Sequence, residues 1–361
     1  MPVRTQWSVS ESEGYDALCF WAPLAGEPES LRQYSQEVAA FAPRFDPKAL
    51  ETIKAVYQRT AAAGNVLTHS ACRHFSAGPH STIDDLIHSA RNLDTVLKPR
   101  HLLDPEWEGD ELWERYRQLM PAAIMILEAM KAAGFSEFRQ KLYQEKYEAR
   151  AQQLLASLSP YNAVSEVQFL TGRPFQPNVD IALTYFSYPR GMRMLGQEFV
   201  TWAGYSDDII LNTSAHELMH PPLDLRGRAM QRAISKLFAN GFYVDVVTRR
   251  DPALGDVGDL PNYVEECMVQ ALDQIASERR GSKRRAVDFF SRSNGADVLA
   301  ASFYGLLKQD NYDQAGGNFE KWVETAVAAG RFKAEPLEAA ARQVLGVSSR
   351  SVWKPYEQPT D

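Results

Sequence analysis

The sequence predicts an α+β fold that is predominantly helical, with a small β-sheet packed beside a helix that carries the letters HELMH. Apolar residues recur at helical spacing between capping residues over most of the N-terminal half. Two β-rich segments with alternating apolar and polar residues follow Gly172. We therefore expect a mainly helical region at 1–170, and a region at 171–361 that contains the sheet, the HELMH helix and the C-terminal helices.

The clearest N-terminal helix is Pro47–Ala63. Asp46 precedes it as an N-cap, proline occupies its first position, and Gly64 lies just beyond its end. Pro121 is expected to kink or divide one of the longer helices, because proline lacks the amide hydrogen and clashes with the preceding turn. The other helices are expected at Leu31–Phe41, Ser81–Leu97, Gly109–Met130 and Ser136–Leu158.

The sheet is expected to contain the strands Asn178–Tyr188, Gln197–Tyr205 and Asp208–Leu211, of which the third leads into the HELMH helix. Thr5–Ser10 fits a further strand at the edge of the sheet. Tyr15–Leu24 is apolar, and the spacing of its residues does not distinguish a helix from a strand. An edge strand of such a sheet can pair with an extended peptide.

The C-terminal part of the chain is expected to be helical again, with an irregular arm from Ser348. The helices are expected at Arg226–Asn240, Pro261–Arg279, Ala286–Arg292, Ala296–Gln309, Phe319–Ala329 and Pro336–Leu345.

Charge, hydropathy and cysteine content argue against some classes of partner and of protein. The formal charge of −7 argues against nucleic acid, since phosphate binding needs a concentrated basic surface. No apolar run approaches the roughly 20 residues of a membrane span. The N-terminus lacks the apolar core of a signal peptide, which favours a cytoplasmic protein, although a mature periplasmic or secreted form would look the same. Three cysteines far apart in sequence do not suggest a disulfide framework.

The stretch Ile209–Leu223, IILNTSAHELMHPPL, carries the chemistry. His216 and His220 are four residues apart, so on a helix they lie on one face and can bind one Zn²⁺ ion. Glu217 can take a proton from a water molecule on that zinc, which is the chemistry of the HExxH pattern. Zinc is therefore the expected cofactor, and Glu217 the expected general base.

The surroundings of the motif agree with an active-site helix in most respects. Asn212, Thr213 and Ser214 are good N-cap residues, and Glu217 stands three positions after Ser214, the spacing of a capping box. Pro221, followed by a second proline, disfavours helical geometry at the residue before it. We expect a short helix whose last turn carries the second histidine; an earlier end would remove the i,i+4 geometry.

A catalytic zinc site needs a third protein ligand. The best source is Asn262–Asp273, NYVEECMVQALD, where Glu265 and Glu266 point about 100° apart on a helix, so only one faces the metal. We favour Glu266 because it lies closer to the inner face, with Gln270 or Asp273 as partners that orient the ligands. Glu265, or Asp224 near the motif, is the alternative ligand.

HELMH followed by a distant helix with an E-E-small-apolar run resembles the gluzincin branch of the zincin metallopeptidases. It also resembles uncharacterised bacterial gluzincin-like families in which the second histidine precedes proline. The resemblance covers about Gln197–Asp273 and implies His216, His220 and Glu266 as zinc ligands, with Glu217 as general base. The best-known members have asparagine before the ligand glutamate and glycine after it, whereas this chain has glutamate and cysteine.

The preferred hypothesis is a zinc metallopeptidase that acts on a peptide or protein substrate. A non-catalytic binding or scaffold protein with the zincin fold, and a zinc hydrolase of a non-peptide amide, remain as alternatives. The candidates for stabilising the oxyanion are Tyr263, Tyr304 and Tyr312. A second group of residues of the kinds that bind metals contains His69, Cys72, His74 and His80. For this group we favour a loop with ordinary histidines over a role at the active site.

Overall fold

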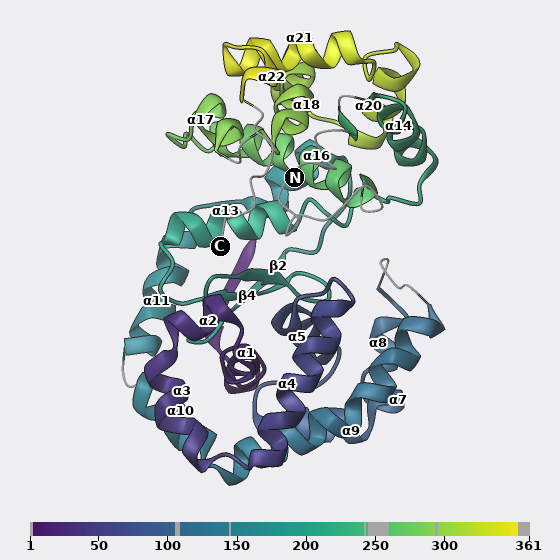
Figure 1. Ribbon diagram of the computed structural model, residues 1–361. Helices are drawn as coiled ribbons and strands as arrows, with labels where there is room; N and C mark the ends of the chain where they lie inside the picture. The colour runs from purple at the N-terminus through teal and green to yellow at the C-terminus, as the bar shows by residue number, and fades with distance from the viewer. Residues whose placement is uncertain are drawn as a thin grey trace. The chain divides into compact units, whose positions relative to one another are not determined.

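The computed structural model describes residues 3–104, 109–143, 146–241, 243–244, 260–292 and 295–352. Most of these residues are helical, and four short strands form one sheet, so the predicted α+β, predominantly helical fold is confirmed (Figure 1). In the part of the chain so described, no single helix is long and apolar enough to cross a membrane. Only the bent pair Trp113–Ala132 and Phe135–Tyr143 passes that test of length and composition together.

The chain forms two compact units. One contains Thr5–Tyr161 and Gln176–Ser214, and the other contains Met1–Arg4, Asn162–Phe175 and Ala215–Asp361. The expected regions, 1–170 and 171–361, differ from these two units in their boundaries. The difference arises because the first strand of the chain pairs with a strand that starts at Asn178, which ties the sheet to the N-terminal helices.

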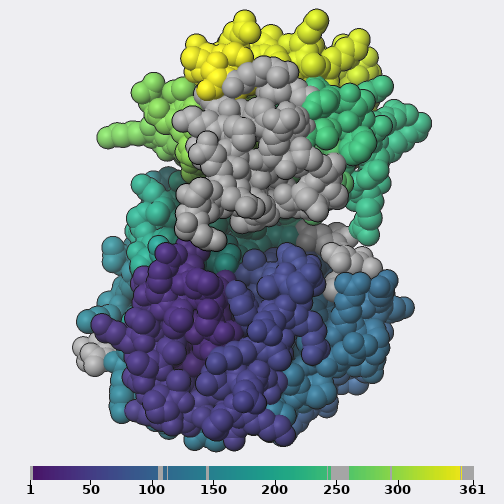
Figure 2. Space-filling model, viewed as in Figure 1, coloured from purple at the N-terminus to yellow at the C-terminus, as the bar shows by residue number. Residues whose placement is uncertain are grey.

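The first unit is built around α1 (Glu13–Ala25), which is buried on every side from Gly14 to Leu24. A helix that is apolar all round belongs in the centre of a core. Phe20 on α1 packs against Phe41, Phe135 and Phe186. On the face seen in Figure 2, the N-terminal helices, purple to blue, form a contiguous surface.

The other helices of this unit mostly follow the expected segments. Asn92 ends the helix expected at Ser81–Leu97 early, and α9 continues through Pro121, so that proline does not divide it. The helices are α2 (Pro28–Gln33), α3 (Ser35–Phe41), the 3-10 turn η1 (Ala42–Arg44), α4 (Pro47–Ala62), α5 (Leu67–Phe75), α6 (Ile83–Arg91), α7 (Leu93–Val96), α8 (Lys98–His101), α9 (Asp110–Ala132), α10 (Phe135–Tyr143) and α11 (Lys146–Leu158).

The sheet has the order β1-β2-β4-β3. β1 (Gln6–Glu11), β2 (Asn178–Thr184) and β4 (Glu198–Trp202) run parallel, and β3 (Gly191–Arg193) pairs antiparallel with β4. The strands predicted at 5–10, 178–188 and 197–205 are thus present, the last two in shorter form. α1 packs against β2 (Figure 1).

The second unit is helical among its described residues, and α16 (Leu260–Arg279) and α18 (Val298–Gln309) form its buried centre. The predicted helices agree with it closely, and the expected irregular arm begins instead with a short helix; residues 353–361 lie outside the described part. The remaining helices are α12 (Ala163–Thr171), α14 (Arg228–Phe238), α17 (Ala286–Ser291), α19 (Tyr312–Ala315), α20 (Phe319–Ala328), α21 (Ala334–Leu345) and α22 (Ser349–Val352).

Candidate metal centre

The helix that carries the first histidine is α13 (Asp207–Glu217). The prediction of a strand at Asp208–Leu211, with a capping box from Ser214, is wrong. The helix begins five residues before the first expected cap. The Ser206 hydroxyl accepts a hydrogen bond from the Ile209 amide at 3.4 Å, and two aspartates lie in the first turn, where negative charge stabilises a helix. Ser214 lies inside the helix and donates its hydroxyl to Ile210 O at 2.8 Å.

His220 does not lie on that helix. The chain leaves helical geometry after Glu217, and Met219 N donates to His216 O at 2.9 Å, the tighter i→i+3 pattern of a final turn. Leu223 N then donates to His220 O at 2.9 Å, across the two prolines. The expectation that the last helical turn carries His220 is therefore wrong, for the reason that the prolines suggested.

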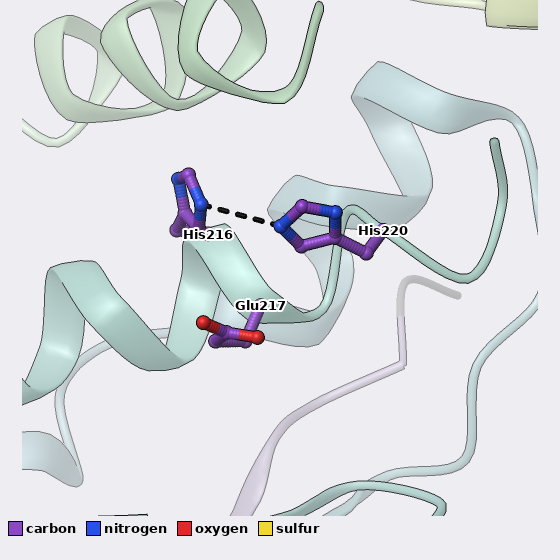
Figure 3. A group of neighbouring side chains, drawn as sticks. All are labelled: His216, Glu217 and His220. Carbon is purple, nitrogen blue, oxygen red and sulfur yellow. Dashed lines mark hydrogen bonds between the residues drawn. The ribbon is translucent and has the colours of Figure 1, made fainter. Parts of the chain in front are cut away.

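The two imidazole rings nevertheless converge. The Nε2 atoms of His216 and His220 are 3.3 Å apart, and the ring planes meet at 69° (Figure 3). The expected loss of ligand geometry on early helix termination does not occur, because the turn after Glu217 brings the second ring back toward the first.

Helix α16 brings a carboxylate to this pair, and that carboxylate belongs to Glu266. Its Oε1 lies 3.6 Å from Nε2 of His216, and its Oε2 lies 3.5 Å from Nε2 of His220. Four ligands placed tetrahedrally at 2.0–2.1 Å from a zinc ion lie about 3.3–3.4 Å from one another. The 3.3 Å between the two Nε2 atoms fits one edge of such a tetrahedron, and Glu266 places one oxygen near each nitrogen, at 3.6 Å and 3.5 Å.

The residue before Glu266, Glu265, contacts the other nitrogen of the His220 ring. Glu265 Oε1 lies 3.0 Å from Nδ1 of His220. Gln270, one turn further along α16, donates its amide to Glu266 Oε1 at 2.9 Å. Of the two partners expected to orient the ligands, Gln270 thus contacts the carboxylate, whereas Asp273 pairs with Arg284 at 2.8 Å.

Electrostatics couple the first histidine to the third candidate ligand. Burial alone would lower the pKa of His216, but the charge of Glu266 outweighs it and raises that pKa to about 9. Burial likewise opposes ionisation of Glu266, and the charge of His216 holds its pKa at about 2. The pair is therefore an imidazolium and a carboxylate at neutral pH, and a divalent cation would take the place of the proton between them.

Glu217 stays within reach of the rings. Among the residues that the structure describes, His216, Glu217 and His220 offer ligand atoms that lie within 4.8 Å of one another. In Figure 3 the Glu217 carboxylate lies below the ribbon, while the rings face each other above it. Glu217 is therefore near the two rings, although its carboxylate lies on the other side of the ribbon.

The site is partly open to solvent. The side chains of His216 and His220 are 19% and 20% exposed, and that of Glu266 is 41% exposed.

The alternative ligand Asp224 forms an ion pair with Arg226 at 3.6 Å.

The three tyrosines predicted as oxyanion stabilisers point their hydroxyls elsewhere. Tyr263 donates to Ala296 O at 2.6 Å, Tyr304 to Glu278 at 2.6 Å, and Tyr312 to Leu170 O at 2.8 Å. Their hydroxyls contact other parts of the second unit, so these contacts give no support to an oxyanion role.

The second group of histidines and cysteine does not form a single cluster. Cys72 Sγ lies 3.8 Å from Cys19 Sγ, His74 is buried beside His101, and His80 contacts Glu198 at 3.0 Å. The expected loop is wrong, because His69, Cys72 and His74 lie on helix α5, but the contacts agree with ordinary histidines.

Comparison of the chain with protein-family models, with curated proteins and with solved structures finds no match. The interpretation of this centre therefore depends on its own geometry.

Proposed function

We propose that this chain is a zinc-dependent metallopeptidase in which His216, His220 and Glu266 hold one zinc ion and Glu217 acts as general base. The observation that carries the proposal is the pair of Nε2 atoms 3.3 Å apart, with the two oxygens of the Glu266 carboxylate 3.6 Å from one nitrogen and 3.5 Å from the other. Two imidazoles and one glutamate are the donor set of several catalytic zinc sites, in which the fourth position is left open.

Zinc bound at this centre supplies Lewis acidity toward a substrate carbonyl and toward water. Glu217, which is not one of the three proposed ligands, takes a proton from the attacking water and passes it to the leaving nitrogen, acting first as base and then as acid. The ligand side chains are partly exposed, as access of a substrate to this centre requires. The resemblance to gluzincins agrees with these assignments.

Elemental analysis and a peptide assay on the same preparations test the proposal. Wild-type protein should carry one zinc ion per chain and cleave casein or a mixed peptide library, with loss of both after chelation and recovery on adding zinc. Glu266→Ala should lose the metal. Glu217→Gln should keep the metal and lose turnover by about 10²-fold or more, since general acid–base catalysis contributes about 10²–10⁴-fold.

Glu335→Gln provides a matched control, because this exposed carboxylate begins a different helix. Unchanged turnover in Glu217→Gln would remove the mechanism. Zinc bound without hydrolysis of any peptide would favour a binding or scaffold protein, and hydrolysis restricted to small non-peptide amides would favour the other hydrolase. Wild-type protein without zinc affinity would remove the metal centre itself.

A further inference from the structure

His220 is a ligand candidate that no helix holds in place. It lies three residues beyond the end of α13 and directly before Pro221, so helical hydrogen bonds do not fix its backbone. A ring in such a turn needs other contacts if its Nε2 atom is to stay 3.3 Å from that of His216.

Two adjacent carboxylates of α16 supply those contacts from opposite sides of the ring. Glu265 Oε1 lies 3.0 Å from Nδ1, and Glu266 Oε2 lies 3.5 Å from Nε2. The Glu265 side chain is only 17% exposed, compared with 41% for Glu266, so it is the better shielded of the two. The angle of about 100° between neighbouring helical residues, which prevents both from facing one ion, allows both to contact one ring.

The contact with Glu265 determines which nitrogen of the His220 ring carries the hydrogen. An ionised carboxylate only accepts hydrogen bonds, so at 3.0 Å the Nδ1 atom of His220 has to donate its hydrogen to Glu265. In the neutral ring this leaves the lone pair on Nε2, which faces Glu266 and His216. A carboxylate in this position also makes the imidazole a better metal ligand.

We infer that Glu265 is a positioning residue, which holds His220 in the Nδ1–H tautomer and directs its Nε2 atom into the metal centre. The inference rests on the proposed zinc site for its purpose, but the contact between Glu265 and His220 stands without a metal. It also gives a role to the residue that sequence reasoning treated only as a rival ligand.

Variants at this position separate the two roles. Glu265→Ala removes the acceptor, and zinc affinity, measured by competition with a chromophoric chelator, should fall about 10–100-fold while the stoichiometry stays at one. Glu265→Gln retains an acceptor oxygen and should recover part of the affinity. Glu335→Ala is the matched control, and thermal unfolding identifies any variant that fails to fold.

Long-range ¹H–¹⁵N NMR of the imidazole supplies a readout that a merely structural residue would not change. His220, assigned by comparison with His220→Asn, should be the Nδ1–H tautomer in wild-type protein, with and without chelator. In Glu265→Ala the Nε2–H form should gain population after chelation. A wild-type Nε2–H ring, or an unchanged tautomer and affinity in Glu265→Ala, would overturn the inference.

The remaining outcomes distinguish this inference from the proposed function. If Glu265→Ala loses stoichiometric metal while Glu266→Ala keeps it, Glu265 is the ligand and the positioning role is wrong. If wild-type protein binds no zinc, the proposed function fails, and the tautomer comparison still decides whether Glu265 positions the ring.

Discussion

Zinc and protons should compete for His216. Its pKa of about 9 means that, at neutral pH, a proton occupies the nitrogen that the metal needs. Zinc binding therefore displaces one proton, and apparent affinity should fall about tenfold for each pH unit below about 9, or about 100-fold from pH 9 to pH 7. Without metal the sign is opposite: a raised histidine pKa stabilises the fold below about pH 6.5, and this contribution is lost as the pH rises through about 9.

Isothermal titration calorimetry in buffers of different ionisation enthalpy measures this proton release directly. Glu266→Gln tests the cause on metal-free protein, because it removes a proposed ligand together with the charge that raises the pKa of His216. An NMR titration of the His216 ring should show its pKa fall from about 9 to near or below the ordinary value of about 6.5, since burial then acts without that opposing charge. Affinity that stays constant from pH 7 to pH 9, after correction for zinc hydrolysis, would refute the reasoning.

Three further predictions concern the first unit. Asp16→Ala should cost about 3–5 kcal/mol in the free energy of unfolding, because it removes the fully buried partner of Arg139, 2.8 Å away, and leaves that guanidinium only the half-exposed Glu11; urea unfolding measures this, and a loss below 1 kcal/mol would contradict it. His80 contacts acceptors with both ring nitrogens, and Glu198 raises its pKa against the opposing effect of burial. The resulting stability should be present below about pH 6.5 and lost as the pH rises through the folded-state pKa; a His80→Gln variant with the same pH profile as wild type would exclude this. Asp46→Ala should cost about 1 kcal/mol, since its carboxylate caps α4 through two amides at 2.8 and 3.0 Å; an unchanged melting temperature would argue against the cap.

Local patterns were sufficient for most of the helices and for two histidines of the centre. The α4 helix has a cap, an initial proline and a terminal glycine, all of which act within a few residues, and the structure follows them closely. The segment Asp208–Leu211 was misread because its three apolar residues fit a strand and a helix equally well. Ser206, with two aspartates after it, was the better signal for the start of the helix.

The arrangement of the centre could be predicted only in part. The adjacent pair Glu265 and Glu266 indicated which helix supplies the acidic group, because helical geometry fixes their relative direction. The position of His220 depends on a turn whose path past Pro221 is set by tertiary packing, which no local pattern reports. A histidine pinned from two sides therefore appears only when the helix and the turn are seen together.

The parallel pairing of β1 with β2 has a consequence for biosynthesis. Gln6 lies opposite Asn178, so the first strand emerges from the ribosome long before its partner exists. Until then α1, apolar on all faces, lacks part of its cover, and a nascent chain of this length is open to aggregation. Chains that end just before Asn178 and are released from the ribosome should bind chaperones more strongly than released chains that end after Trp202, where β4 ends.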